Sequence, residues 1–251
     1  MKALITGASS GIGADMARIL SCLGYDLILV ARNKERLNCL KEELGTSVQV
    51  ISMDISSTFN CMKLYNKVKN QDIDVVINNA GFGLFGEFAD TDMDRELDMI
   101  DLNIKAVHIL TKLFLKDFKE KDRGYILNVA SSAGFGPGPL MATYYATKAY
   151  VLHLTEAIGE ELRCDGSSVY VGALCPGPVN TNFNQVAGVQ FGVKAMDSYD
   201  VAVYAIDRMF ARKSIIIPGR MMKFVCFGRR FLPRKLVSRF TYRIQKAKVI
   251  D

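Results

Sequence analysis

The stretch Thr6-Gly7-Ala8-Ser9-Ser10-Gly11-Ile12-Gly13 (TGASSGIG) decides the fold of this 251-residue chain. It follows an apolar segment, Ala3–Ile5, and opens a segment with helical spacing. Gly7 permits a tight turn, Gly11 lets the backbone approach a ligand, and Gly13 allows the helix to lie close to the sheet. A strand, a glycine loop and a helix in this order place helix N–H groups against a pyrophosphate. The stretch predicts a dinucleotide-binding fold; the alternative is a glycine-rich turn without a ligand.

Apolar and helical segments alternate along the rest of the chain. Seven short apolar segments have the composition of buried strands: Ala3–Ile5, Leu27–Val30, Val48–Ser52, Val75–Ile77, Tyr125–Val129, Val169–Leu174 and Ile215–Ile217. Helical spacing marks segments between most of them: Ile12–Leu23, Glu35–Leu44, Met93–Phe118 and Tyr145–Leu162. This order predicts a doubly wound, parallel α/β sheet of about seven strands with helices on both faces. We expect one domain over residues 1–251, since no linker or repeat divides the sequence.

The composition is ordinary for a globular protein, with 49% hydrophobic and 23% charged residues. The six cysteines form no CxxC pair and there are only two histidines, so no metal site is expected. The sequence has no signal-peptide pattern and no apolar run near the ~18 residues needed to span a bilayer. These features predict a soluble, cytoplasmic protein.

The net charge of +6 is distributed unevenly. Residues 214–251 contain ten Lys/Arg and one acid, which gives +9, whereas the remaining residues contain 22 bases and 25 acids, which gives −3. The basic character therefore belongs to the C-terminal segment and needs its own explanation.

The end of the second predicted strand bears on the choice of cofactor. About twenty residues after the glycine loop, a fold that prefers NAD offers an acid, but this chain has Ala31 followed by Arg32. A carboxylate there repels a 2′-phosphate, whereas a guanidinium forms a charge-assisted pair with it. Arg32 predicts NADP(H) in preference to NAD(H); the alternative is a solvated arginine at the start of a helix.

Five motifs together resemble those of the classical short-chain dehydrogenases/reductases. They are the glycine loop at Thr6–Gly13, Asn78-Asn79-Ala80-Gly81, the turn Asn128–Ser132, YxxxK at 144–148, and Pro176-Gly177. They follow the family's order and spacing between Lys2 and Ile217. The resemblance implies an oxidoreductase that interconverts a secondary alcohol and a ketone with a nicotinamide cofactor.

Two tyrosines compete for the catalytic role, Tyr144 and Tyr145. The family's pattern has a lysine four residues after the tyrosine and a serine thirteen residues before it. Tyr144 meets both conditions, with Lys148 and Ser131, whereas position 149 is alanine. The resemblance therefore implies that Tyr144 is the catalytic tyrosine, and Tyr145 is expected to pack or to line the pocket. His108 and His153 are expected to be surface or packing residues.

The chemistry explains why these residue types stand together. Reduction of a carbonyl by hydride leaves negative charge on oxygen, so a donor has to deliver a proton. A free phenol has a pKa near ~10, and we expect Lys148, together with the cationic oxidised nicotinamide, to favour the phenolate of Tyr144. Ser131 can hold the substrate oxygen. The resemblance also implies that Asn103 completes a proton relay; the alternative is a polar residue that kinks a helix.

Further cofactor residues are implied by the resemblance. Asn79-Ala80-Gly81 passes beside the adenine ribose, and Thr181 contacts the nicotinamide carboxamide. Asp54 contacts the adenine amino group or, alternatively, caps the following helix. The whole implied set is Gly7, Ser9, Ser10, Gly11, Ile12, Gly13, Arg32, Asp54, Ile55, Asn79, Ala80, Gly81, Tyr144, Lys148, Pro176, Gly177, Val179 and Thr181.

Substrate specificity is expected in Asn182–Tyr199, an apolar segment with glycines at 188 and 192 that suits a lid. Phe82, Leu84 and Phe85, with residues 135–141, extend the apolar wall. No cluster of bases marks a phosphate site in these loops. We therefore favour a hydroxyl or ketone on a hydrophobic, steroid-like skeleton, with a 3-oxoacyl thioester or other lipid-like ketone as the alternative. A redox sensor that binds NADP(H) without turnover is disfavoured, because all four catalytic positions are filled.

The C-terminal segment, about residues 219–251, predicts a basic amphipathic helix that begins near Pro233. Leu236, Val237, Phe240 and Ile244 recur at helical spacing opposite Lys235, Arg239, Arg243 and Lys246. Such a helix covers a protein core or a neighbouring subunit, which we favour, or lies on an anionic membrane. A homodimer or homotetramer is expected, and nucleic acid is not an expected partner.

Overall fold

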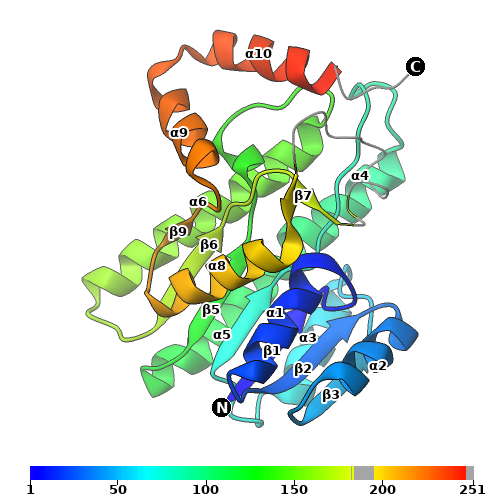
Figure 1. Ribbon diagram of the computed structural model, residues 1–251, viewed down its shortest axis with the longest axis vertical. Coiled ribbons are helices and arrows are strands. Elements are labelled where there is room, and N and C mark those ends of the chain that lie inside the picture. Colours follow the sequence, from blue (N-terminus) through cyan, green and yellow to red (C-terminus); the bar gives the residue numbers. More distant parts are fainter. Residues whose placement is uncertain (182, 184–194, 247–251) are drawn as a thin grey trace.

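The computed structural model describes residues 1–181, 183 and 195–246, and its centre is a sheet of seven parallel strands (Figure 1). The strands follow the order β3-β2-β1-β4-β5-β6-β9. Their bounds are β1 Lys2–Thr6, β2 Asp26–Ala31, β3 Val48–Ser52, β4 Val75–Asn78, β5 Tyr125–Val129, β6 Tyr170–Leu174 and β9 Ile215–Ile216. The predicted doubly wound α/β sheet is confirmed. Its strand order reverses between β1 and β4, which is where such folds bind ligands.

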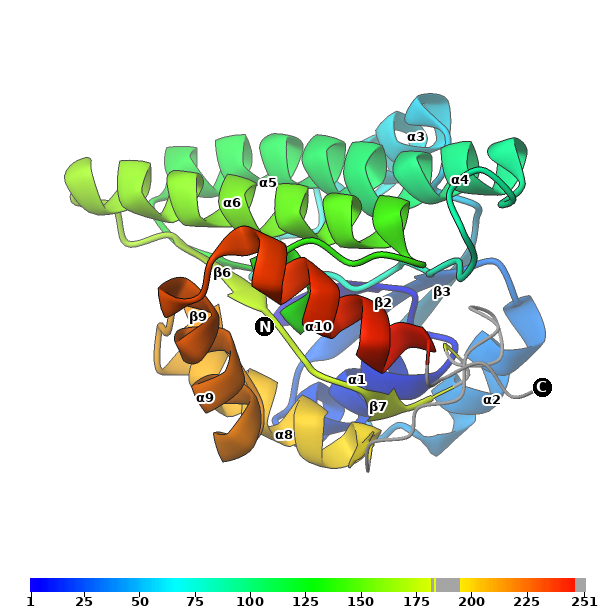
Figure 2. The ribbon, with the colours of Figure 1, turned by 90° about the horizontal axis from the view of Figure 1, so that it is seen from above.

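Two hydrophobic cores explain why the strands are wholly apolar. In β1, Ala3 and Ile5 belong to one core and Leu4 to the other, because successive side chains of a strand point to opposite faces. Helices α1 (Gly11–Cys22), α2 (Lys34–Glu43) and α8 (Ser198–Phe210) cover one face. The other face is covered by α3 (Thr58–Val68), α5 (Val107–Lys121) and α6 (Ala142–Cys164), as Figure 2 shows.

The prediction of one continuous helix over Met93–Phe118 is wrong in detail. The segment divides into α4 (Met93–Ile100), a π-helical turn at Asp101–Ala106, and α5. Side chains cannot reveal this change, since apolar spacing alters little over one turn. Single π-helical turns inside α-helices frequently occur at functional sites, and Asn103 lies in this one.

A buried network of amides and hydroxyls joins the centre of the sheet to its helices. Asn78 on β4 and Asn128 on β5 are register partners, and the Asn78 amide donates to the Asn128 side-chain oxygen at 2.8 Å. Thr111 on α5 donates to the same oxygen at 3.1 Å, and the Asn128 amide donates to Thr155 on α6 at 3.0 Å. The network fixes β4 and β5 relative to both helices, just below the site.

Two further strands lie outside the main sheet. β7 (Val179–Asn180) pairs in parallel with β8 (Met196–Asp197), and α8 begins at Ser198 with Asp197 as its N-cap. The predicted lid over residues 182–199 therefore ends too late, since its last four residues form β8 and the start of α8. Residues 182 and 184–194, which hold most of its apolar side chains and both glycines, lie outside the described residues.

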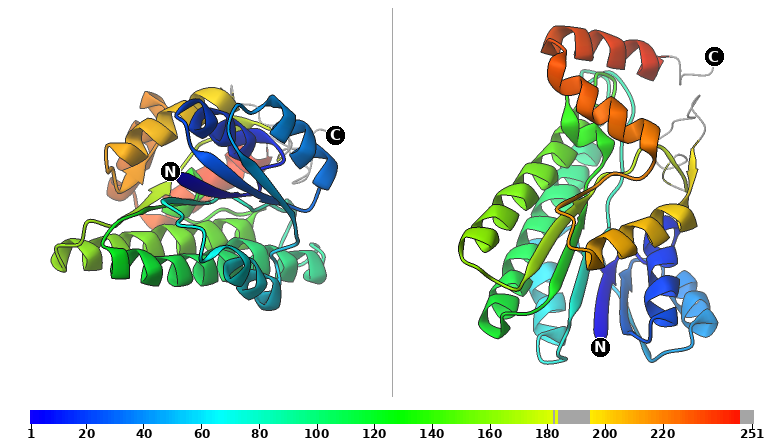
Figure 3. Two further views of the ribbon diagram at one scale, coloured as in Figure 1. Left: turned by 90° about the horizontal axis from the view of Figure 1, so that it is seen from below. Right: turned by 60° about the vertical axis from the view of Figure 1, so that its left-hand side comes forward.

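The C-terminal segment forms α9 (Arg220–Gly228), a 3-10 turn (Arg229–Phe231) and α10 (Arg234–Lys246). Figure 3 shows α10 at the end of the molecule opposite the start of β1, so it lies at the carboxyl ends of the strands. Among the described residues, no helix combines the length and the apolar character needed to cross a bilayer.

The buried side of α10 differs from the predicted one. Val237, Thr241 and Gln245 are buried, whereas Leu236, Phe240 and Ile244 from the predicted apolar face are exposed. The reason is that α10 packs over the polar mouth of a cavity and not over the core. Gln245 donates a hydrogen bond to the Tyr145 hydroxyl at 2.7 Å.

Candidate active site

The glycine loop is held against the end of β4 by Thr6 and Asn79. The Thr6 hydroxyl accepts hydrogen bonds from the backbone N–H groups of Asn79 (3.0 Å) and Ala80 (3.1 Å). The Asn79 amide donates to the carbonyl oxygens of Thr6 (3.0 Å) and Gly7 (3.1 Å). A Cβ on Gly13 would lie 2.4 Å from that amide and 2.5 Å from the Gly7 carbonyl oxygen. The close approach of α1 to this loop therefore requires glycine at position 13.

The first turn of α1 fits a pyrophosphate. Ser9, Ser10, Gly11 and Ile12 line a cavity of about 570 Å³, and the N-cap residue Ser10 makes no side-chain capping hydrogen bond. Backbone N–H groups in the first turn of a helix lack intrahelical partners and carry the positive end of the helix dipole. They are thus available to an anion in the cavity.

Two arginines stand at the far end of this cavity. Arg32 follows β2 and is exposed, and its backbone carbonyl accepts a hydrogen bond from the Ser52 hydroxyl at 2.9 Å. Asn33 caps α2 by accepting from the Arg36 N–H at 2.8 Å. Both Arg32 and Arg36 line the cavity. The sequence prediction missed Arg36, which lies in the first turn of α2 and carries no motif of its own.

The acid after β3 lies beside the cavity and does not cap a helix. Asp54 and Ile55 line the cavity, and the Asp54 carboxylate accepts from the Ser56 N–H at 2.9 Å. Helix α3 is capped instead by Ser57, whose hydroxyl accepts from the Asn60 N–H at 3.1 Å. The alternative prediction for Asp54, capping of the following helix, is therefore wrong.

The segment after β6 forms the opposite wall. Pro176, Gly177, Val179 and Thr181 line the cavity. The Pro176 carbonyl accepts hydrogen bonds from the Ser132 N–H at 2.8 Å and from the Ser131 hydroxyl at 3.5 Å, which ties this wall to the turn after β5.

Tyr144, Lys148 and Ser131 all line the cavity. Tyr144 and Lys148 lie one turn apart on α6 and both are buried. The Lys148 ammonium donates to the Val129 carbonyl at 2.8 Å, and its nitrogen lies 5.9 Å from the centre of the Tyr144 ring. The Ser131 side chain is close enough to Tyr144 to favour its phenolate form.

Burial is the largest influence on the pKa values of Tyr144 and Lys148. It raises the pKa of Tyr144 to about 12, although the Ser131 side chain acts in the opposite direction. Burial also lowers the pKa of Lys148 to about 8. The expectation that the ammonium brings the tyrosine pKa down is not met in the free protein, because desolvation of the phenolate is the larger effect. At neutral pH Tyr144 therefore carries a proton that it can donate.

Asn103 lies behind the cavity and does not line it. Its amide donates to the Phe82 carbonyl at 2.9 Å and to the Thr147 hydroxyl at 3.1 Å, and its oxygen accepts from the Phe82 N–H at 3.1 Å. A Cβ on Gly81 would meet both the Asn103 oxygen, at 2.8 Å, and the Lys148 nitrogen, at 3.5 Å. The Asn103 side chain thus secures the loop after β4 next to Lys148, and a role in proton relay stays a prediction.

Tyr145 points toward the C-terminal helix. It lines the cavity, its ring lies edge-on to that of Tyr144 at 6.2 Å, and its hydroxyl accepts from Gln245. The Gln245 side-chain oxygen is buried without a hydrogen-bond partner in the described part of the chain. The sequence prediction missed Gln245, which carries no motif and lies 100 residues from Tyr145.

The cavity gathers most of the predicted site residues. Of the predicted catalytic and cofactor-binding residues, Gly13 and Asn103 alone do not line it. Of the predicted apolar wall, Phe82 and Met141 line it, whereas Leu84, Phe85 and Phe135 do not. Phe82, Met141 and Phe183 form an apolar wall around Tyr144, and neither His108 nor His153 takes part. In the described residues, no group of three His, Cys, Asp or Glu side chains is arranged to hold a metal ion.

A glycine loop at a helix N-terminus, a strand-order reversal and a buried tyrosine–lysine pair define a dinucleotide-dependent oxidoreductase. The family model for short chain dehydrogenases matches residues 1–190. The chain belongs to this family, and it is an oxidoreductase that acts on a secondary alcohol or a ketone.

Comparison with known proteins gives relatives over most of the chain. An uncharacterized oxidoreductase of Staphylococcus epidermidis is 35% identical over 210 residues, which cover 81% of this chain and 90% of the relative. The very-long-chain 3-oxoacyl-CoA reductase-B of Danio rerio is 27% identical over 246 residues, covering 95% and 78% of the two chains.

Solved structures extend the comparison. A short-chain dehydrogenase from Sphingobium yanoikuyae in complex with NADPH has a TM-score of 0.84 and 30% identity, and the match covers 94% of each chain. The bulky-bulky ketone specific alcohol dehydrogenase from Comamonas testosteroni has a TM-score of 0.78 and 29% identity, and the match covers 92% of each chain.

Proposed function

We propose that the protein is an NADP(H)-preferring reductase of hydrophobic ketones, and that it also oxidises the corresponding secondary alcohols. One observation carries the proposal: a single cavity is lined both by two arginines and by Tyr144 with its apolar neighbours. The cations suit a 2′-phosphate, and the wall suits an apolar substrate.

Arg32 and Arg36 support the cofactor preference. Both are exposed cations at the cavity's edge, and in the described residues neither forms a salt bridge with a carboxylate. A guanidinium that is not already paired is free to form a charge-assisted bond with phosphate. The NADPH complex of the relative from Sphingobium yanoikuyae is in keeping with this preference.

The residues around Tyr144 supply acid catalysis. When bound, the nicotinamide cofactor supplies or accepts the hydride. Tyr144 donates its phenolic proton to the carbonyl oxygen, which Ser131 holds by a hydrogen bond. The Lys148 ammonium, charged below a pKa of about 8, stabilises the phenolate that remains. Asn103 keeps the Phe82 loop against Lys148.

The substrate is best described as a bulky apolar ketone with a second polar group. Phe82, Met141 and Phe183 offer apolar contact near Tyr144. The unpartnered oxygen of Gln245 can accept a hydrogen bond from a hydroxyl group at a distance from the reacting carbonyl. A steroid-like skeleton combines both features, and the bulky-ketone relative from Comamonas testosteroni agrees with the first.

A second candidate is a 3-oxoacyl thioester. It is favoured by the similarity to the very-long-chain 3-oxoacyl-CoA reductase-B of Danio rerio. A long acyl chain fits the same apolar wall, but it does not account for a polar acceptor at Gln245.

A substrate panel tests the proposal. Oxidation of NADPH and of NADH would be followed with hydroxylated ketosteroids, 3-oxoacyl thioesters, sugars and small polar ketones. We expect turnover with NADPH on the ketosteroids. Turnover confined to sugars or small polar ketones contradicts the proposal of an apolar substrate. A preference for thioesters favours the second candidate instead.

A further inference from the structure

The C-terminal helices expose apolar side chains where a soluble protein normally buries them. Phe224 on α9 is 76% exposed, Phe231 is 73% exposed, and Phe240 on α10 is 53% exposed. Further exposed apolar residues on the same elements are Met221, Val225, Phe227, Leu232, Leu236 and Ile244. We call the exposed faces of residues 220–246 the C-terminal surface. Large apolar side chains exposed in this number on successive elements mark an interaction site.

The C-terminal surface also carries many basic side chains and no acidic side chain to neutralise them. Residues 220–246 contain nine bases and no acid: Arg220, Lys223, Arg229, Arg230, Arg234, Lys235, Arg239, Arg243 and Lys246. In the described part of the chain none of these nine forms a salt bridge with an acid from another element. The surface therefore favours a partner that carries negative charge.

The side chains of α10 form three stripes along the helix: one buried, one exposed and apolar, and one basic. At 3.6 residues per turn, Val237, Thr241 and Gln245 form the buried stripe. The exposed apolar stripe of Leu236, Phe240 and Ile244 lies beside it. Lys235, Arg239 and Arg243 fall opposite the buried stripe and so point away from the protein. A helix with adjacent apolar and basic stripes is typical of helices that lie in a membrane interface.

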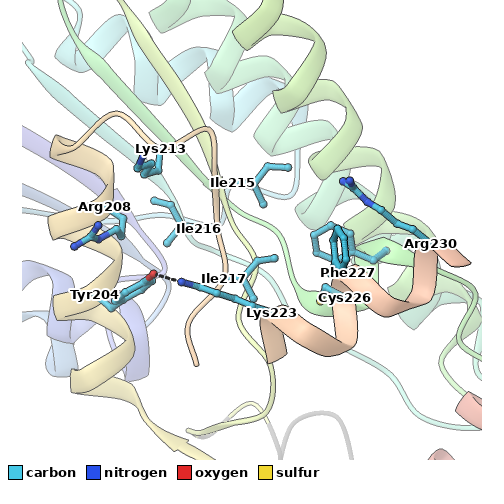
Figure 4. Close-up of a pocket in the computed structure, with 11 residues that line it drawn as sticks. Tyr204, Arg208, Lys213, Ile215, Ile216, Ile217, Lys223, Cys226, Phe227 and Arg230 are labelled. Carbon is cyan, nitrogen blue, oxygen red and sulfur yellow. Dashed lines mark hydrogen bonds between the residues drawn. The ribbon is translucent and has the colours of Figure 1, made fainter. Parts of the chain in front are cut away.

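The positive charge continues into a cavity of about 410 Å³ between α8, β9 and α9 (Figure 4). Arg208 and Lys213 stand at one end and Arg230 at the other, beside Phe227. The Lys223 ammonium reaches the Tyr204 hydroxyl at 2.7 Å. The floor is apolar, formed by Ile215, Ile216 and Ile217. Arg208 also pairs with Asp207 at 2.8 Å, so the free positive charge of this cavity comes mainly from Lys213 and Arg230.

We propose that the C-terminal surface docks on an anionic lipid bilayer. The exposed phenylalanines enter the interface and the bases contact the headgroups. A second copy of the chain is a poorer occupant, because a two-fold contact would bring the same uncompensated bases together. Since α10 also covers the cavity at Gln245, docking brings the substrate site next to the bilayer.

Vesicle co-sedimentation of the full chain with NADPH tests this proposal. We expect binding to phosphatidylcholine vesicles that contain phosphatidylglycerol and none to pure phosphatidylcholine, with loss of binding at high salt. The charge-reversal variant Lys235→Glu/Arg239→Glu/Arg243→Glu should bind roughly a hundredfold more weakly, since each cation contributes roughly fivefold. Its control, Lys41→Glu/Lys63→Glu/Lys67→Glu, carries the same charge change on α2 and α3 and should keep most of the binding.

A second pair of variants tests the apolar contribution. Phe224→Ser/Phe231→Ser/Phe240→Ser should lose vesicle binding, whereas Phe59→Ser/Phe88→Ser, which alters exposed phenylalanines elsewhere, should not. Unchanged turnover of a dispersed ketone and an unchanged melting temperature show that each variant is folded. Equal vesicle binding by surface and control variants overturns the proposal. So does a dimer of the unaltered protein that the phenylalanine variant converts to a monomer.

Discussion

The body of the protein and its C-terminal helices line the same cavity, but they differ in which side chains they bury and which they expose. In the body, residues 2–217, apolar strands are buried in two cores and polar motif residues emerge at their carboxyl ends. In α9 and α10, most large apolar side chains are exposed, although Cys226 and Val237 are buried, and a polar side chain, Gln245, lines the cavity. The body thus holds the candidate catalytic residues. The helices contribute one wall of the cavity and the C-terminal surface. Variants in each region should affect different kinetic constants.

The largest effect is expected from the two adjacent tyrosines. Tyr144→Phe removes the proton donor and should lower kcat by about 10²–10⁴-fold, with NADPH affinity unchanged. Tyr145→Phe removes only the hydroxyl that Gln245 contacts, so kcat should change little. Steady-state kinetics with NADPH binding by fluorescence checks both. An inactive Tyr145→Phe beside an active Tyr144→Phe reverses the assignment.

The next effect concerns the cofactor end of the body. Arg32→Ala should weaken NADPH binding by about tenfold to a hundredfold, since a charge-assisted bond contributes ~1.5–3 kcal/mol. NADH binding should stay nearly constant. Lys34→Ala, an exposed cation between Arg32 and Arg36 that does not line the cavity, serves as the matched control. Titration of both dinucleotides measures the preference, and equal affinities in the unaltered protein contradict it.

The pH profile tests the buried lysine. Burial lowers the pKa of Lys148 to about 8, so the ammonium is present below that pH and is lost above it. Ketone reduction consumes a proton, and its kcat/KM should therefore fall as pH rises through about 8, approaching tenfold per unit. A constant rate up to pH 10 is the opposite outcome and would show that the ammonium is not required.

The smallest effect is expected from the C-terminal wall. Gln245→Leu removes a hydrogen bond of ~0.5–1.5 kcal/mol, and KM for a hydroxylated ketone should rise about twofold to tenfold with kcat nearly unchanged. Thr241→Val, also buried on α10 but outside the cavity, is the control. If Gln245→Leu lowers kcat and leaves KM unchanged, the helix belongs to the catalytic machinery and the contrast between the two regions fails.

Most strands, helices and site residues of the body could be predicted from the sequence, because the patterns that indicate them are local. Alternating strands and helices, the glycine loop and the Tyr144–Lys148 spacing each lie within one or two elements, so their patterns survive without knowledge of the fold. The same reasoning predicted the parallel sheet and most of the residues that line the cavity. It missed the π-helical turn at Asn103, because a change in backbone hydrogen bonding leaves hardly any trace in side-chain spacing.

The C-terminal helices show where such reasoning stops. Apolar periodicity predicted that Leu236, Phe240 and Ile244 face the protein, but the choice of buried stripe depends on what the helix meets. It meets Tyr145 and a cavity mouth, so polar Gln245 is buried instead. Likewise the tyrosine pKa could not be inferred from Lys148 alone, since burial of the phenol is a property of the whole fold.

The paired amides of Asn78 and Asn128 have a consequence for folding. Parallel strands form late, because their contacts are distant in sequence, and a one-residue slip turns every side chain of a strand to the other face. A one-residue slip of β4 along β5 would separate the two amides and leave buried polar groups unsatisfied, at ~1–3 kcal/mol each. Asn78 directly precedes the Asn79–Gly81 loop, and Ser131 follows three residues after Asn128. The Asn78–Asn128 pair therefore favours the one alignment of β4 and β5 that places the Asn79–Gly81 loop and Ser131 beside each other at the site.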